Sequence, residues 1–153
     1  MPDALPSDQQ PHAARRRWMA VLARARADEL AAHLGPLPPY RVLRGPEVGL
    51  VMVRGRTGGG GGPFNLGEMT TTRCTVRTEK GILGHAYIAG RDARLAELAA
   101  VADALLQDPP QQTALLERVI TPLAASQQAE RDAISEKAAA TRVEFFAMRN
   151  MRT

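Results

Sequence analysis

The chain contains one cysteine, few aromatic residues and no long apolar run, and each scarcity excludes a class of protein. Because Cys74 is the only cysteine in 153 residues, no disulfide can form within the chain and no four-cysteine zinc or iron–sulfur site can be built. A lone cysteine in a strand is ordinarily a small core residue. No run reaches the length of a membrane span, and the N-terminus has no apolar segment typical of a secretory signal. We therefore expect a soluble, cytoplasmic protein with no membrane contact.

Motifs that carry catalysis or bind nucleotides are also missing. The glycine run at 58–62 is followed by Pro63-Phe64-Asn65, whereas a P-loop requires Gly-Lys-Ser/Thr and then a helix. The three histidines, His12, His33 and His85, form no zinc-binding pattern. No serine lies in a nucleophile elbow. The residues therefore predict no catalytic centre and no metal site in this chain, and they favour a hairpin tip over a phosphate loop at the glycine run.

Length and composition support one globular domain. Apolar residues make up 44% of the chain, enough for a core of its own. Prolines and polar residues predict a disordered tail at 1–11, which leaves a single domain at 12–153. The net charge of +4 is compatible with an anionic ligand or with nucleic acid. An aromatic content of 4% argues against a stacking platform for single-stranded nucleic acid.

Four strand-like segments follow one another without an intervening helix. They lie at about 40–45, 49–57, 66–78 and 82–90, and turn residues separate them. Gly45-Pro46 marks the first turn, and Glu79-Lys80-Gly81 marks the last. Because short connections force neighbouring strands to pair antiparallel, we expect a four-stranded meander.

Helices are predicted before and after these strands. Residues 12–34 have helical periodicity, and a polar junction at 24–28 predicts two short helices there. After the strands, Asp92 is a suitable N-cap for a helix with one apolar stripe: Leu95, Leu98, Ala99, Ala102, Leu105 and Leu106. A shorter helix is expected to close at Pro122. A long helix follows from 123 to about 148, and its polar middle predicts contact with another chain. The fold class is α+β, with the helices packed on one face of the sheet.

Basic residues are the candidate functional residues. Arg15 to Arg17 fit either an anion site or, preferably, a solvated helix start. If the two central strands pair as expected, their four arginines form a basic patch on one side of the sheet. Arginine binds phosphate and phosphonate through a planar fork, but methionine and leucine on the same faces favour an interface. The candidates for interface or anion contact are Arg54, Arg56, Arg73, Arg77, His85 and Arg91.

Several uncommon strings, in this order, resemble the G subunit of the bacterial carbon–phosphorus lyase system, the PhnG family. They are GLVMVR, R-T-G-G, FNLGEMTTTRCTVR and GHAYIAGRD among the strands, RRRWMAVLARA before them and TRVEFFAMR near the end. The resemblance spans nearly the whole chain after the tail. The glycine run looks longer than the family's usual loop and the tail looks extended, which argues against a catalytic role for the loop tip.

The resemblance implies a subunit of the carbon–phosphorus lyase core complex in phosphonate catabolism. Its partners would be the H, I and J subunits, with two copies of this chain per complex. With H, I and L it would support transfer of methylphosphonate to ATP, supplied as MgATP. Adenine would leave C1 of the ribose, giving ribose 1-methylphosphonate 5-triphosphate. In this family of complexes, nucleosidase chemistry is ascribed to the I subunit, and radical carbon–phosphorus cleavage to the J subunit with its iron–sulfur cluster. We therefore expect an assembly-forming subunit of a transferase complex that is not catalytic by itself and binds no cofactor.

Two alternatives stay open. In the first, the chain contributes active-site arginines directly to the phosphonate transfer and is enzymatic in part. In the second, it is a basic nucleic-acid-binding module, whose binding would weaken as salt rises.

Overall fold

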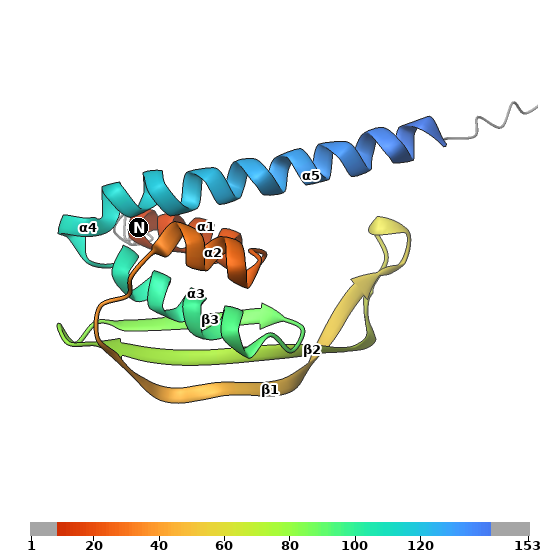
Figure 1. Cartoon of the computed structure of the whole chain (residues 1–153). Coiled ribbons are helices and arrows are strands. Elements are labelled where there is room, and N and C mark those ends of the chain that lie inside the picture. The colour runs from red at the N-terminus through yellow and green to blue at the C-terminus, as the bar shows by residue number, and fades with distance from the viewer. Residues whose placement is uncertain (1–8, 142–153) are drawn as a thin grey trace, which may run out of the picture.

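The computed structural model of the chain describes residues 9–141 and has helices packed on one side of an open antiparallel sheet (Figure 1). The strands are β1 (Tyr40–Arg56), β2 (Pro63–Thr78) and β3 (Leu83–Ala89), in the spatial order β1-β2-β3. Both strand pairs are antiparallel. The predicted α+β class, the meander order and the one-sided helical cover are confirmed.

The sheet has three strands in the described residues, and the prediction of four is wrong. The segments expected at 40–45 and 49–57 belong to the single strand β1, and Gly45-Pro46 lies inside it. Between Arg44 and Glu47, β1 advances three positions while β2 advances two, so the extra residue is absorbed in a bulge. Proline cannot donate to a strand ladder, but β1 is an edge strand and a bulge there tolerates it.

The described helices are α1 (Gln9–Leu22), α2 (Ala27–Leu34), α3 (Ala93–Leu106), α4 (Pro109–Leu115) and α5 (Thr121–Ala140). The gap between α1 and α2 confirms the predicted junction. The N-cap is confirmed as well, because Asp92 Oδ1 accepts a 2.9 Å hydrogen bond from the backbone N–H of Leu95.

The helix expected to close at Pro122 continues through it. A π-helical turn, Leu116–Ile120, joins α4 to α5, and the N–H of Thr121 bonds back to the carbonyl of Leu116. Pro122 falls in the first turn of α5. Proline has no N–H for the regular helical ladder, and the π-helical turn just before Pro122 is where that ladder is already interrupted. The helical run therefore extends from Pro109 to Ala140.

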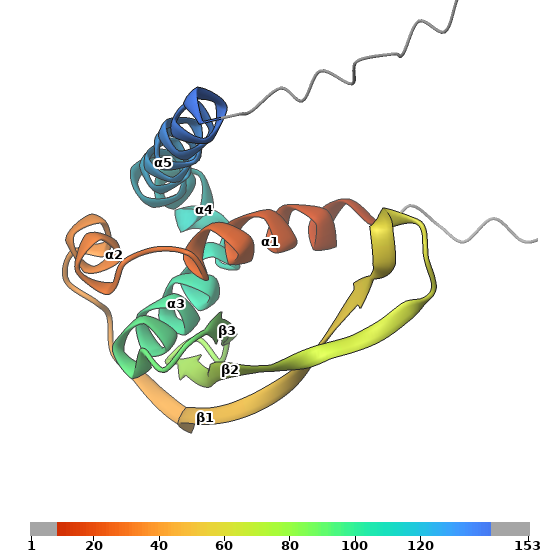
Figure 2. The same ribbon diagram turned by 90° about the vertical axis from the view of Figure 1, so that its right-hand side faces the viewer.

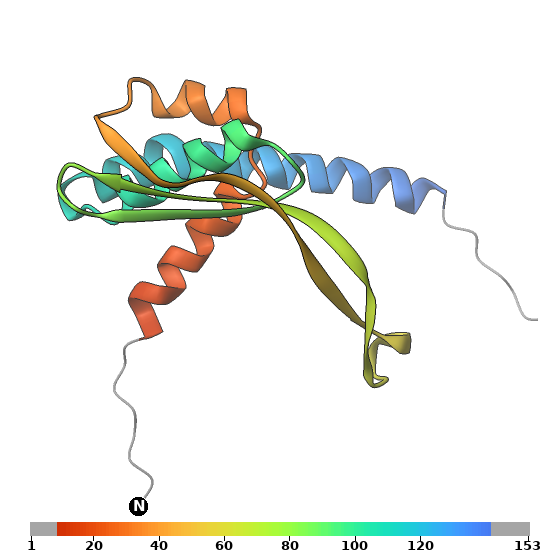
Figure 3. The ribbon, with the colours of Figure 1, turned by 90° about the horizontal axis from the view of Figure 1, so that it is seen from below.

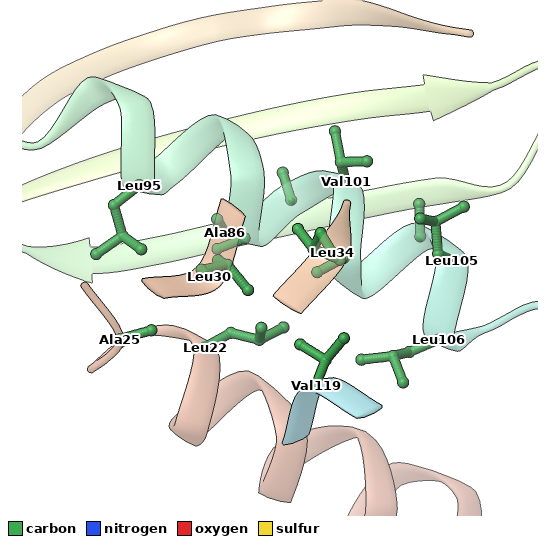
Figure 4. Packing of buried hydrophobic residues seen from close by; sticks show 14 of the residues in the cluster. Leu22, Ala25, Leu30, Leu34, Ala86, Leu95, Val101, Leu105, Leu106 and Val119 are labelled. Carbon is green, nitrogen blue, oxygen red and sulfur yellow. The ribbon is translucent and has the colours of Figure 1, made fainter. Parts of the chain in front are cut away.

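Helix α3 lies between the sheet and the other helices (Figures 1 and 2). It is buried well beyond the single predicted stripe, since Ala96, Ala100 and Val101 are also inaccessible. Its alanines let β3 approach closely: a Cβ added to Gly84 would lie 1.9 Å from the carbonyl oxygen of Ala100. Figure 4 shows the second layer of the core, where leucines of α1 and α2 meet α3: Leu22, Leu30, Leu34, Leu95, Leu105 and Leu106.

A fully buried carboxylate fastens α1 and β3 to α3. Asp103 accepts hydrogen bonds from Nε and Nη2 of Arg15, at 3.1 and 2.7 Å, and from Nε1 of Trp18 at 2.9 Å. The backbone N–H of His85 donates to it at 2.9 Å, and Nε2 of Gln107 lies at 3.3 Å. Because β3 is a sheet edge, Asp103 provides a partner for an N–H that faces away from β2.

Part of the predicted architecture lies outside the described residues. This applies to residues 1–8 of the expected tail and to the apolar end of the last helix, with Val143, Phe145, Phe146 and Met148. The first helix begins at Gln9, earlier than expected. Within residues 9–141, no helix is long and apolar enough to cross a membrane.

Candidate functional site

One face of the sheet has no helix over it, as Figure 3 shows from below. Along β2 the buried residues Cys74 and Val76 face α3, so the exposed residues that alternate with them lie on the open face. The register adds residues of β1 and β3 to this face. We call it the open sheet face, and its polar members are Arg41, Arg44, Glu47, Arg73, Thr75, Arg77 and His85.

Two of the four arginines on this face are paired with a carboxylate. Glu47 Oε1 lies 3.1 Å from Nε of Arg44, and its Oε2 lies 3.2 Å from Nε of Arg73. The hydrogen bond from Arg44, reinforced by Arg73, holds the pKa of Glu47 below its usual range. Glu47 is therefore an anion over the physiological range and offsets part of the positive charge.

Arg41 and Arg77 face each other across β1 and β2, and neither forms an ion pair with a described residue. Like charges directly opposite one another destabilise a sheet. This end of the open sheet face therefore favours an anionic group from outside the chain.

The structure thus brings together three of the predicted candidates, Arg73, Arg77 and His85. His85 Nδ1 lies 3.1 Å from the hydroxyl of Thr75 on the neighbouring strand. Sequence reasoning missed Arg41 and Arg44. A four-stranded meander would have paired the segment at 40–45 with 49–57, whereas the observed β1 pairs it with β2. Had Gly45-Pro46 been interpreted as a bulge within one strand, the sequence would have placed Arg41 and Arg44 opposite β2.

Arg54, Arg56 and Arg91 lie elsewhere. Arg54 is opposite Asn65 and Arg56 is opposite Pro63, far along the hairpin from Arg73. Because Leu50 pairs with Thr70, the alternation also places Arg54 and Arg56 on the opposite side of the hairpin from Arg73. The prediction that the four strand arginines share one patch is therefore wrong. Arg91 is exposed in the connection from β3 to α3.

The β1–β2 hairpin continues well past the third strand. Since β3 pairs only with residues 71–77 of β2, residues 50–56 and 63–70 form a two-stranded extension, which we call the hairpin arm (Figures 1 and 3). Its large apolar side chains are solvent-exposed: Leu50 by 61%, Met52 by 51%, Phe64 by 43%, Leu66 by 66% and Met69 by 41%. An isolated two-stranded ribbon is marginally stable in water, and exposed apolar clusters mark interaction sites.

The glycine run forms the tip of this arm. A 3₁₀ turn at Thr57–Gly59 leads into β2, and Arg56 Nη1 donates a 3.2 Å hydrogen bond to the carbonyl of Gly61. A strand follows the glycines where a P-loop would have a helix. The prediction of a hairpin tip is confirmed.

Cys74 is a core residue, as predicted, with 1% of its surface exposed. Burial raises the pKa of its thiol, which disfavours the reactive thiolate. Among the described residues, no three His, Cys, Asp or Glu side chains lie close enough to hold a metal ion.

The family model described as "Phosphonate metabolism protein PhnG" matches residues 13–150, which include the core, the open sheet face and the whole hairpin arm. The chain belongs to the PhnG family. A PhnG relative from Rhizobium meliloti (strain 1021), "Alpha-D-ribose 1-methylphosphonate 5-triphosphate synthase subunit PhnG", is 46% identical over 151 residues. That alignment covers 97% of this chain and 96% of the relative. The resemblance noted in the sequence is confirmed, and PhnG membership assigns the chain to phosphonate metabolism.

Proposed function

We propose that this PhnG-family chain is an assembly-forming subunit of the complex that makes ribose 1-methylphosphonate 5-triphosphate. Its similarity, over nearly the full length, to a protein named as a subunit of that synthase supports this proposal most strongly. The complex would use methylphosphonate and MgATP and release adenine from C1 of the ribose. The partners would be the H, I and J subunits of the carbon–phosphorus lyase core, with L joining this first reaction and two copies of this chain present.

The hairpin arm supports a role in assembly. Burying a large apolar side chain stabilises a complex by roughly 1.5–3 kcal/mol, so covering even the most exposed pair, Leu50 and Leu66, is worth several kcal/mol. Nothing in the described part of the chain covers these residues. A partner subunit with an apolar groove could cover these side chains and stabilise the complex, with no change in the helices or in the three-stranded part of the sheet.

The open sheet face supports a second contact, with acidic residues of a partner. Arg41 and Arg77 lie opposite one another without a described carboxylate, and a partner's Asp or Glu would relieve their repulsion. The same two arginines also favour the alternative in which the chain is enzymatic in part, because they could bind phosphonate or triphosphate directly. Tyr87 is the only Phe, Tyr or Trp side chain on the three-stranded part of the described open sheet face, which gives little support to a nucleic-acid module.

The proposal is tested by leaving this chain out of the complex. The tagged partner subunits are co-expressed with and without this chain, and adenine release from MgATP and methylphosphonate is measured. We expect the assembly without the chain to be incomplete and inactive, with activity restored by adding the chain back. Full adenine release by partners that lack the chain would contradict the proposal.

Arg77→Ala then separates the two roles of the open sheet face. Loss of adenine release from a complex of native mass favours direct contact with substrate. Loss of the complex itself favours a docking role. Arg24→Ala, an exposed arginine beyond the end of α1, is the control and should leave both readouts unchanged.

A further inference from the structure

Helix α1 passes the edge of β3 (Figure 3). Side chains of the two elements line an open groove of about 650 Å³. Five residues line it: His12, Arg15, Arg16, Met19 and His85. Four of the five can carry positive charge, and no acidic side chain is among these lining residues. We call this the α1–β3 groove.

The charges in the groove differ in how far they are compensated. Arg15 is paired with the buried Asp103 at 2.7 Å, so its charge is neutralised while its position is fixed. Arg16 has no described carboxylate partner, and its only recorded hydrogen bond is a 3.4 Å contact from Nε to the carbonyl of His12. His12 precedes Arg16 by four residues, so both side chains lie on the same side of α1.

His85 contributes from the strand side. Its Nδ1 is engaged with the Thr75 hydroxyl at 3.1 Å, which leaves Nε2 as the ring nitrogen without a recorded partner in the described residues. Its backbone N–H is bound to Asp103, so the strand and the helix are held together beside the groove. Residues from two elements that are far apart in sequence therefore line one opening, and Asp103 holds the two elements in place.

We propose that the α1–β3 groove binds a multiply charged tetrahedral oxyanion, the chemistry shared by inorganic phosphate, a phosphonate and a polyphosphate chain. The guanidinium of Arg16 and the imidazole of His12, on the same side of α1, can donate to different oxygens of one such group. No Phe, Tyr or Trp is among the lining residues of the groove. The site belongs to this chain alone, so it does not depend on the proposed assembly.

Titration calorimetry of the full-length chain tests this site with three probes at one pH and ionic strength: inorganic phosphate, methylphosphonate and inorganic triphosphate. We expect saturable binding of at least one probe, and the tightest identifies the natural class of anion. Arg16→Gln should weaken binding about tenfold, as expected for loss of a hydrogen bond between charged groups. His12→Gln should weaken it in the same direction.

Arg17→Gln is the matched control. It removes the same charge from the neighbouring position on α1, but Arg17 does not line the groove. Its affinity should stay within about twofold of the native chain, and all variants should keep the native melting temperature because these side chains are exposed. The proposal is overturned by absence of saturable binding of all three probes. It is equally overturned by an unchanged affinity in Arg16→Gln, or by equal losses in Arg16→Gln and Arg17→Gln.

Discussion

Gly84 on β3 gives the sharpest test of how the sheet and α3 fit together. A Cβ at this position would lie 1.9 Å from the carbonyl oxygen of Ala100 and 2.7 Å from both Cβ and N of Ala104. The obstructing atoms are mostly backbone, so no side-chain rotation can relieve the clash. To restore ordinary contact distances, α3 must retreat by roughly 1 Å or more.

Helix α3 cannot retreat freely, because α1 and α2 pack against its other side and Asp103 fastens it to β3. Gly84→Ala should therefore cost about 3 kcal/mol of unfolding free energy, at the upper end for added core volume. For a chain of this length the melting temperature should fall by roughly 6–12 °C.

The assay is urea and thermal unfolding followed by circular dichroism. Gly49→Ala is the matched control, since Gly49 is also a strand glycine but nothing lies within 4 Å of its added Cβ. The control should remain within about 0.5 kcal/mol of the native chain. If Gly84→Ala unfolds within about 0.5 kcal/mol of native as well, the described packing of β3 on α3 is wrong.

Three further predictions concern single side chains. Asp103→Ala should destabilise the chain by about 3–5 kcal/mol, because the buried N–H groups of Trp18 and His85 lose their acceptor. Amide hydrogen exchange should accelerate along β3, and native-like exchange there would contradict this. The hydrogen bond from Tyr40 to Glu97 raises the pKa of Tyr40 to about 12, so its stabilising effect is complete below pH 10 and is lost between pH 10 and 12. Tyr40→Phe should lack that loss in pH-dependent unfolding, and identical pH profiles would refute the assignment. Cys74 should react with a thiol reagent only after unfolding, whereas rapid labelling of the native chain would show that it is accessible.

Local signals in the sequence predicted local structure well. The polar junction between α1 and α2, the Asp92 cap and the turn at Glu79-Lys80-Gly81 depend on residues within a few positions of one another. The errors arose where distant parts of the chain override a local rule. Gly45-Pro46 reads as a turn, but pairing with β2 over the full length of β1 carries the strand through it. Pro122 reads as a helix end, but the π-helical turn accommodates it.

The functional surfaces depended even more on tertiary structure. Arg41 joins Arg77 only because the first two predicted strands are one strand. The α1–β3 groove joins His12 and Arg16 to His85, which lies about 70 residues away and has no shared periodicity with them. The family strings supplied the biological context, which neither the composition nor the spacing of the arginines contained.

The most direct test of the account is native mass spectrometry of the tagged chain co-expressed with its proposed partners. The native chain should be recovered in a stable assembly with several other subunits, in two copies. Leu50→Ser combined with Leu66→Ser should abolish that assembly without unfolding the chain, because both side chains are mostly exposed. Ile134→Ser removes an equally exposed apolar side chain from α5 and tests separately the contact with another chain predicted for the middle of that helix. A native chain that is recovered alone would contradict the subunit proposal, and an assembly that survives the paired substitution would show that the hairpin arm is not its docking element.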